Sequence, residues 1–298
     1  MFRLLTRWWV RPYKQKKAPS KKVAIVIPLS TRTEFTSDER ISLHHLVHFL
    51  GRYDKYLIAP SGMQIELEGF RVKHFSSKFF GSVAAHGHLL GSPLFYKTFA
   101  DYEYVFFHHL DSLAFADELS DWCDRDFDYI GPPWIPSPDS QWVTKPRVGN
   151  GGFTLLRVRA ALTVLYNRYR MAPATYWLDL FTRNGKRLQP LIRLLEKLQP
   201  LFPRWKLVNA PLEEWRMTED PGPNSRNNDV FWSDRAVRFL PEFKVASFEE
   251  GLRFAFEAAP RTCFEMNGRK MPFGCHAWAR YDRSFWEPFL LPQETVAR

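Results

Sequence analysis

The sequence predicts an α/β fold in which a mostly parallel central sheet is covered by helices on both faces. Short apolar runs typical of buried strands alternate with segments of helical periodicity, and this alternation favours a parallel sheet. The chain has 298 residues, of which 45% are apolar and 16% aromatic, so it can bury a large core. We therefore interpret residues 23–298 as a single domain that follows a basic segment at residues 1–22.

The expected elements follow one another from residue 23. Residues 23–28 (VAIVIP) have the composition of a buried strand. Ser37 or Asp38 can cap a helix that runs to about Leu50, because their side chains accept hydrogen bonds from free amides at a helix start. The remaining expected elements before the glycine-rich segment are strands at 56–59, 70–75, 104–110 and 128–133, and a helical region at 89–99.

Ligands of open parallel sheets bind beyond the carboxyl ends of the strands. The residues after the expected strands are therefore the first candidates for a site: Ser30, Thr31 and Arg32 after the first strand, Asp111 after the central strand, and the segment VGNGGFTLLR at 148–157. Glycine permits φ > 0 and a close approach of the backbone to another molecule. We expect a small molecule to lie against Gly149, Asn150, Gly151 and Gly152.

Asp111 has two interpretations. It can cap the turn that follows the strand, or it can ligate a divalent cation that holds a diphosphate, since Mg²⁺ often needs only one or two protein carboxylates. Strand side chains alternate, so at least one of His108 and His109 is expected to be buried and structural. His276, in the segment MPFGCHAW, follows a Phe-Gly turn and is a candidate to close a metal or phosphate site.

Asp229 lies in the segment NNDVFW, after a loop rich in Pro, Gly and Asn. Asn227, Asn228 or Asp229 can cap a helix there. If the same helix start lies at the rim of a cleft, the carboxylate can accept the proton of an attacking hydroxyl group. The two roles are compatible.

The positive charge of the chain is concentrated in two segments. Of a net charge of +10, residues 1–22 carry +8 and residues 183–206 carry +6, which leaves −4 for the rest. A nucleic-acid binder carries its charge on the folded domain, so we expect no nucleic-acid partner. The first segment mixes Phe, Leu and Trp with cations, which favours an anionic membrane surface as partner over a flexible tail. The second is a basic amphipathic insertion that is either another membrane contact or a core helix with a charged face.

Other features lead us to expect a cytoplasmic protein, and the basic segment adds the expectation of peripheral attachment to the inner face of the membrane. The sequence shows no secretory signal and no run of about 20 apolar residues. The three cysteines are Cys123, Cys263 and Cys275, an odd number without C-x-x-C spacing, so neither a disulfide framework nor a structural zinc site is indicated.

The order of HLDS, DYIGPPW, VGNGGFTLLR, NDVFW and PFGCHAW resembles a bacterial and fungal family of glycosyltransferase-like proteins, usually described only as a domain of unknown function. The resemblance covers about residues 23–280. That family is in turn similar to GT-A nucleotide-sugar glycosyltransferases such as Fringe and the beta-galactosyltransferases. It implies a GT-A-like fold, with Asp111 and His276 as ligands of a divalent cation (Mn²⁺ or Mg²⁺) and Asp229 as the catalytic base. Gly149, Asn150, Gly151, Gly152 and Asn228 would line the donor and acceptor cleft.

Two departures from this pattern matter. The two-carboxylate D-x-D is absent, because His109 stands where its first Asp would fall, and Asn228 replaces the usual Glu before Asp229. The resemblance implies transfer of a sugar from a nucleotide-sugar donor to a glycan or lipid-linked acceptor, in cell-surface polysaccharide synthesis. The alternative is a non-catalytic protein of the same fold that binds a nucleotide sugar or glycan at the membrane surface. Three arginines are candidates to assist at the phosphates, although such residues are more often only solvated: Arg32, Arg147 and Arg157.

Overall fold

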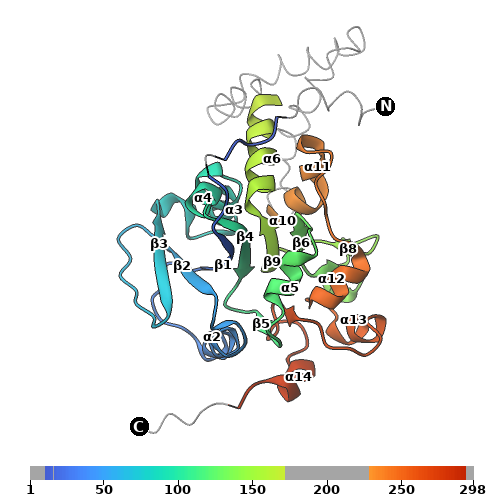
Figure 1. Ribbon diagram of the computed structural model, residues 1–298. Helices are drawn as coiled ribbons and strands as arrows, with labels where there is room; N and C mark the ends of the chain where they lie inside the picture. Colours follow the sequence, from blue (N-terminus) through green and yellow to red (C-terminus); the bar gives the residue numbers. More distant parts are fainter. Residues whose placement is uncertain (1–10, 16, 172–227, 293–298) are drawn as a thin grey trace, which may run out of the picture.

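The computed structural model describes residues 11–15, 17–171 and 228–292, and a six-stranded sheet lies at its centre (Figure 1). The strand order is β3-β2-β1-β4-β9-β6. Four strands are parallel neighbours: β1 (Lys21–Pro28), β2 (Asp54–Pro60), β3 (Phe70–Phe75) and β4 (Tyr102–His108). In contrast, β9 (Phe153–Arg157) runs antiparallel to both β4 and β6 (Tyr129–Ile130). The predicted α/β fold with a mostly parallel central sheet is confirmed.

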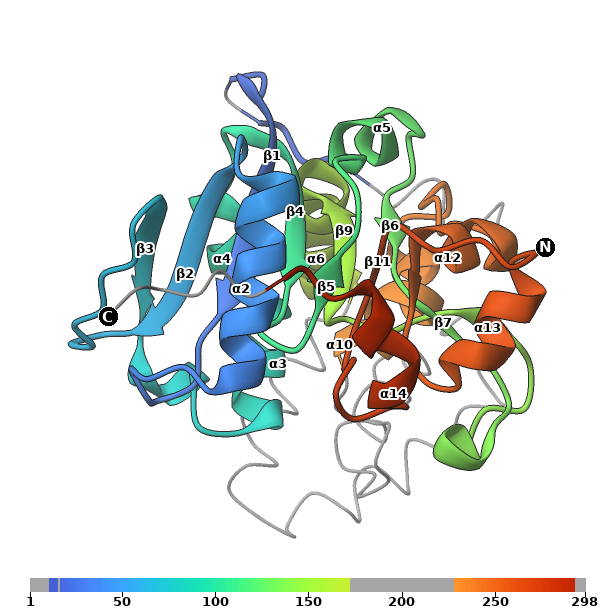
Figure 2. The same cartoon turned by 90° about the horizontal axis from the view of Figure 1, so that it is seen from below.

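The middle strands are apolar almost throughout, because helices cover both faces of the sheet. Residues 23–27 of β1 and 104–107 of β4 are all buried. Helices α4 (Pro93–Thr98) and α6 (Val158–Met171) pack together on one face, and α2 (Ser37–Leu50) lies on the other (Figures 1 and 2).

The start of α2 differs from the prediction by one residue. Its N-cap is Thr36, whose side chain accepts a hydrogen bond from the Glu39 amide while the Glu39 carboxylate accepts one from the Thr36 amide. This reciprocal capping box satisfies two free amides at once, which Ser37 or Asp38 alone would not do. The predicted end of the helix at Leu50 is confirmed.

Three other expected elements are divided or shifted. The helical region at 89–99 is two helices, α3 (Val83–Leu90) and α4, because Pro93 has no amide hydrogen to continue a helix and instead begins the second one. The central strand ends at His108, so His109 already belongs to the following turn. The expected strand at 128–133 is only β6, and Pro133–Trp134 (β7) pairs separately with Arg147–Val148 (β8).

A second, three-stranded sheet joins the C-terminal part of the chain to the end of β4. Its strands are β10 (Ala255–Phe256), β11 (Gly274–Cys275) and β5 (Leu113–Ala114). Cys275 pairs with Leu113, and the Trp278 amide donates to the Asp111 carbonyl over 3.2 Å. This register places the residue after β11, His276, beside the turn that follows β4.

The remaining described helices are short. The segment after residue 227 is α10 (Asn228–Val230), a π-helical turn (Phe231–Arg235) and α11 (Ala236–Phe239), which agrees with the predicted helix start at this point. The others are α5 (Leu119–Asp124), α12 (Phe248–Phe254), α13 (Pro260–Met266), α14 (Arg283–Trp286) and 3₁₀ turns at Ser77–Phe79, Pro138–Ser140 and Glu287–Phe289.

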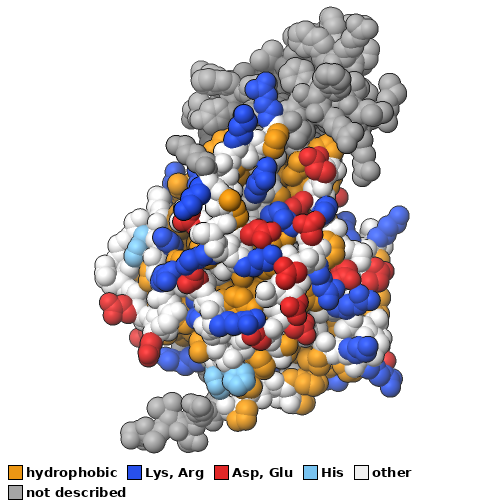
Figure 3. All heavy atoms as spheres, in the orientation of Figure 1, with side chains coloured by type: hydrophobic (Ala, Val, Ile, Leu, Met, Phe, Trp, Pro, Cys, Tyr) orange, Lys and Arg blue, Asp and Glu red, His pale blue; other side chains and the backbone are white. Residues whose placement is uncertain are grey.

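Residues 1–10 and 16 of the predicted basic segment at 1–22, and all of the insertion at 183–206, lie outside the described residues. In the described part of the first segment, Lys21 and Lys22 begin β1, and Tyr13 contacts α6: its amide donates to Thr163, and its ring stacks on Tyr166 with centroids 5.3 Å apart. On the face shown in Figure 3, basic and acidic side chains are interspersed over much of the surface. No helix within the described ranges is long and apolar enough to cross a bilayer.

Candidate functional site

The predicted site residues come together because β9 is antiparallel to β4. Phe153, the first residue of β9, pairs with His108, the last residue of β4. Gly152 therefore lies beside His109, whose amide donates to the Gly152 carbonyl over 2.8 Å. The amino end of β9 thus brings the glycine-rich segment to the same sheet edge as the carboxyl end of β4.

Three potential metal ligands meet at this edge: His109, Asp111 and His276. Their ligand atoms lie within 4.8 Å of one another, and His276 Nε2 is 3.3 Å from Asp111 Oδ1. The predicted pair Asp111 and His276 is therefore adjacent. His109 occupies the first position of the absent D-x-D, so the segment supplies an imidazole and a carboxylate where two carboxylates would be usual. The predicted buried structural histidine is His108, which packs against Phe153.

The charges of this cluster are strongly coupled. Burial alone would lower the pKa of His276, but the carboxylates of Asp111 and Glu257 raise it to about 10. Partial burial would raise the pKa of Asp111, and the charge and hydrogen bond of His276 instead hold it well below its ordinary value. Burial, together with the nearby charge of His276, lowers the pKa of His109 to about 3, so its ring is neutral.

Glu257 is a site residue that the sequence does not reveal. Its side chain is 11% exposed, and its Oε1 accepts hydrogen bonds from His276 Nδ1, over 3.0 Å, and from the Asn150 amide group. Asn150 Oδ1 in turn accepts from the Gly152 amide over 2.9 Å. One feature of the sequence could have indicated Glu257. It directly follows the apolar run that forms β10, and the candidates Asp111 and His276 also come shortly after strands.

The glycines of the segment have different neighbours. Asn150 has a positive φ of 25°, whereas none of the three glycines of the segment has a positive φ. A Cβ at Gly149 would lie 2.1 Å from the Trp134 ring, and one at Gly152 would lie 2.0 Å from the His276 ring. At these two positions protein side chains, and not a ligand, account for the need for glycine. At Gly151 a Cβ would meet only Asp229 Cβ, at 3.4 Å.

Asp229 lies across from Gly151 in the short helix α10, directly after Asn228. Its Oδ1 accepts a hydrogen bond from the Val230 amide over 2.7 Å. Burial raises the pKa of the carboxyl group to about 6, and the negative charge of Glu257 contributes to the rise. A carboxyl group with a pKa near neutrality is suited to accept and release a proton.

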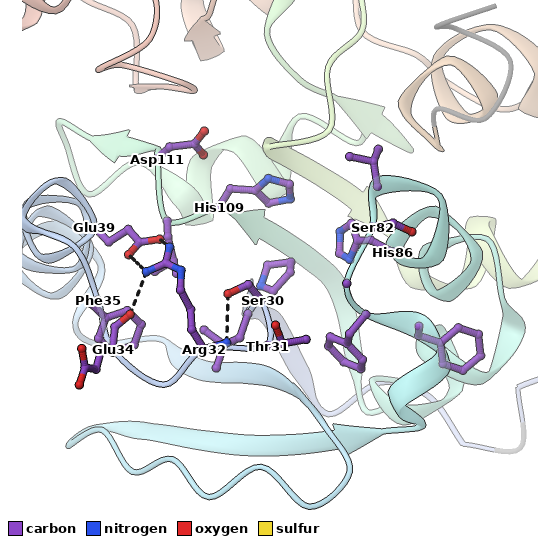
Figure 4. Close-up of a pocket in the computed structure, with 17 residues that line it drawn as sticks. Ser30, Thr31, Arg32, Glu34, Phe35, Glu39, Ser82, His86, His109 and Asp111 are labelled. Carbon is purple, nitrogen blue, oxygen red and sulfur yellow. Dashed lines mark hydrogen bonds and ion pairs between the residues drawn. The ribbon is translucent and has the colours of Figure 1, made fainter. Parts of the chain in front are cut away.

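A cavity of about 540 Å³ adjoins the cluster and is lined by the residues after β1 and β4 (Figure 4). The predicted residues Ser30, Thr31 and Arg32 all line it. In Figure 4 His109 and Asp111 lie at the top of the pocket, Arg32 lies below them and His86 lies on the right. Arg32 already forms an ion pair with Glu39. His86 Nε2 is buried without a hydrogen-bond partner among the described residues, and burial lowers the pKa of this ring to about 4.

Two of the arginines proposed at the phosphates do not lie at this cavity. Arg157 is at the far end of β9, opposite Tyr104, and forms ion pairs with Glu103, Asp126 and Asp128. Its role is structural, because these carboxylates occupy the guanidinium. Arg147 lies over the Trp134 ring, 5.3 Å from its centroid.

These features define an α/β protein with a cavity and a metal-capable cluster at one edge of its sheet. The chain belongs to the family described as "Protein of unknown function (DUF5672)", whose model matches residues 69–276. Among solved structures it is similar to the apo-form glycosyltransferase GlyE of Streptococcus pneumoniae TIGR4, with 12% identity and a TM-score of 0.44. The match covers 91% of this chain and 61% of that one, so this chain spans about three fifths of its length. No curated protein matches the chain.

Proposed function

We propose that this protein is a glycosyltransferase that moves a sugar from a nucleotide-sugar donor to a hydroxyl group of a glycan or lipid-linked acceptor. The observation that best supports the proposal is the position of Asp229, a carboxyl group with a pKa of about 6 that faces Gly151. The same sheet edge carries a cavity of about 540 Å³ with His109 and Asp111 in its wall. The motif order that resembles GT-A transferases supports the same assignment.

The cavity is where we place the nucleotide part of the donor. Pockets for ligands of this size have volumes of roughly 300–1,000 Å³ and combine apolar walls with a few polar groups. Here Phe35, Phe79 and Phe80 supply apolar surface, and Ser30 and Thr31 supply hydroxyl groups. The diphosphate would then point toward Asp111 and the sugar toward Gly151.

The residues at Asp111 fit a divalent cation. His109 belongs to the same cluster as Asp111 and His276. Its Nε2 atom is buried without a hydrogen-bond partner in the described part of the chain. Asp111 and His276 would hold the cation. When bound, a divalent cation stabilises the negative charge on the phosphates of the leaving group.

Asp229 would act as the base. Its carboxylate accepts the proton of the acceptor hydroxyl, whose oxygen forms a bond to the anomeric carbon of the donor sugar. The bond from that carbon to the phosphate oxygen breaks, and the nucleoside diphosphate leaves with the electron pair. Because its pKa is about 6, Asp229 is mostly ionised at pH 7 and ready to accept the proton.

The proposed setting is the cytoplasmic face of a membrane, in cell-surface polysaccharide synthesis. It rests on the basic segment at 1–22, which combines aromatic and cationic residues. Deletion of residues 1–10 leaves the docked Tyr13 in place, and we expect it to abolish pelleting with anionic vesicles. Unchanged pelleting of the shortened chain would remove residues 1–10 as the segment that binds the membrane.

The test of the proposed activity is a thermal-shift panel of nucleotide sugars with and without Mn²⁺, followed by a transfer assay with the donor that binds. We expect one donor to raise the melting temperature and to be consumed in the presence of a sugar acceptor. Asp229→Asn should still bind that donor but lose transfer. Near-normal turnover in this variant would remove Asp229 as the base.

Donor binding without turnover under all conditions would instead favour the non-catalytic binding protein. If no nucleotide sugar binds, the proposed function is wrong.

A further inference from the structure

We infer that the cation site is a transition-metal site in which His109 is the third protein ligand, and that it selects ions such as Co²⁺ or Zn²⁺ over Mg²⁺. The inference deepens the proposed function and rests on it for the place of the cation beside the donor. The binding of the ion itself follows from the geometry of three side chains and can be measured without a donor.

The first argument is the position of the three ligand atoms. His109, Asp111 and His276 each direct one ligand atom into a region where all three lie within 4.8 Å of one another. Ligands of one Zn²⁺ ion at about 2.1 Å are separated by roughly 3–4 Å. The cluster therefore needs only small side-chain shifts to hold one ion. Three protein ligands leave open positions for oxygen atoms of a substrate.

The second argument is the unsatisfied nitrogen of His109. His109 Nε2 is buried and has no hydrogen-bond partner among the residues that the structure describes. A buried polar atom without a partner destabilises the folded state, so such atoms need an explanation. In Figure 4 the ring of His109 lies next to Asp111 at the edge of the cavity. Ligation of a cation by Nε2 would give this nitrogen a partner.

The third argument is the orientation of His276. Its Nδ1 forms a hydrogen bond of 3.0 Å with Glu257, and its Nε2 is directed at Asp111. Glu257 is itself fixed by the side chain of Asn150. A histidine whose far nitrogen donates to a carboxylate is the usual arrangement in protein metal sites, because the carboxylate fixes the tautomer and orients the ring. Glu257 and Asn150 are thus positioning residues for the metal ligand.

The composition of the ligand set determines which ion is preferred. Mg²⁺ prefers oxygen ligands and retains several waters, whereas imidazole suits ions such as Fe²⁺, Co²⁺ and Zn²⁺. A D-x-D would provide two carboxylates, but this site provides one carboxylate and two imidazoles. The replacement of the first acidic position by His109 therefore shifts the preference from Mg²⁺ toward the transition metals.

The experiment is a metal titration of the full chain, prepared without a histidine tag, stripped with a chelator, and kept free of nucleotide sugar. We expect one Co²⁺ per chain, a visible absorption spectrum typical of nitrogen ligation, and a rise in melting temperature. Mg²⁺ should bind at least 100-fold more weakly. Equal affinity for Co²⁺ and Mg²⁺, or no Co²⁺ binding, would overturn the inference.

Two variants identify the third ligand. His109→Gln should weaken Co²⁺ binding at least tenfold, whereas His74→Gln, which changes an exposed histidine of β3 outside the cavity, should leave it unchanged. His109→Asp restores the two carboxylates and should narrow the gap between Co²⁺ and Mg²⁺. Unchanged Co²⁺ binding in both His109 variants would remove His109 as a ligand. If neither variant folds, the absorption spectrum of the unmodified chain decides the question.

The outcome is separate from that of the proposed function. Co²⁺ binding with no nucleotide-sugar binding would support the metal site and refute the transferase. Donor transfer that is insensitive to chelation, in a chain that does not bind Co²⁺, would do the reverse.

Discussion

Replacement of Asp229 by Asn should stabilise the fold at neutral pH while it abolishes glycosyl transfer. The amide oxygen of Asn can still accept the hydrogen bond from the Val230 amide. What the substitution removes is a negative charge in a site that disfavours it. A residue kept for chemistry at the expense of stability would give this combination of effects.

The magnitude follows from the pKa of the Asp229 carboxyl group. Its ordinary value is 3.8, and burial raises it to about 6 in the folded protein. Each unit corresponds to about 1.4 kcal/mol, so the ionised form costs about 2–3 kcal/mol of folding free energy. For a chain of this size we expect the melting temperature of the variant to exceed that of the unmodified chain by roughly 3–5 °C above pH 6.

The Asp229 carboxyl group should make the folded protein less stable as the pH rises. Below about pH 4 the carboxyl group is protonated in both the folded and the unfolded chain, so it contributes its full stability as a neutral group. That contribution is lost between about pH 4, where the group ionises in the unfolded chain, and about pH 6, where it also ionises in the folded chain. The advantage of Asp229→Asn should therefore be small at pH 4, grow up to about pH 6, and stay constant above it.

The assay is thermal unfolding between pH 4 and pH 8, in the presence of a chelator and without donor. Asp234→Asn is the matched control, because Asp234 is an exposed carboxylate in the π-helical turn that follows α10. The reasoning is refuted if Asp229→Asn shows the same pH profile as this control, or if it is less stable than the unmodified chain at pH 8.

Three further predictions concern the residues around this carboxylate. Gly152→Ala should destabilise the protein by roughly 1–3 kcal/mol, because its Cβ would overlap the His276 ring. Gly151→Ala should fold normally and reduce transfer more than donor binding. Equal melting temperatures of the two variants would contradict this difference. Glu257→Gln should weaken metal binding by roughly 10–100-fold, since the His276 ring loses its charged hydrogen-bond acceptor, and an unchanged titration would exclude the positioning role. Arg157→Ala should lower the melting temperature but leave the KM for the donor unchanged, because its three ion pairs lie at the far end of β9; a raised KM would return it to the site.

The sequence predicts much of the sheet, because a buried parallel strand needs a continuous apolar run. The first strand, β1, is an example. The sequence also predicts where helix α2 ends, at Leu50. It does not predict the direction of β9, because residues 153–156 are all buried and, apart from Thr154, apolar, so they would suit either orientation. The direction depends on the path of the chain through β6, β7 and β8, which local periodicity does not encode.

The same distinction applies to the site. Asp111, His276 and Asp229 stand in recognisable segments, so they can be proposed from sequence, and the structure places them at one sheet edge. Glu257 has no motif around it and becomes visible only through its bonds to His276 and Asn150. Arg157 illustrates the opposite error, since its sequence position after the glycine-rich segment suggested a phosphate contact that its ion pairs rule out.

The α/β class and the chemical identity of the groups that could form a site can be predicted from the sequence, because both depend on local composition and order. Which of these groups meet depends on the tertiary structure. The antiparallel β9 brings Gly152 to His109, and the pairing of β11 with β5 carries His276 across the chain to Asp111. Such contacts depend on long-range strand pairing, which no single segment specifies.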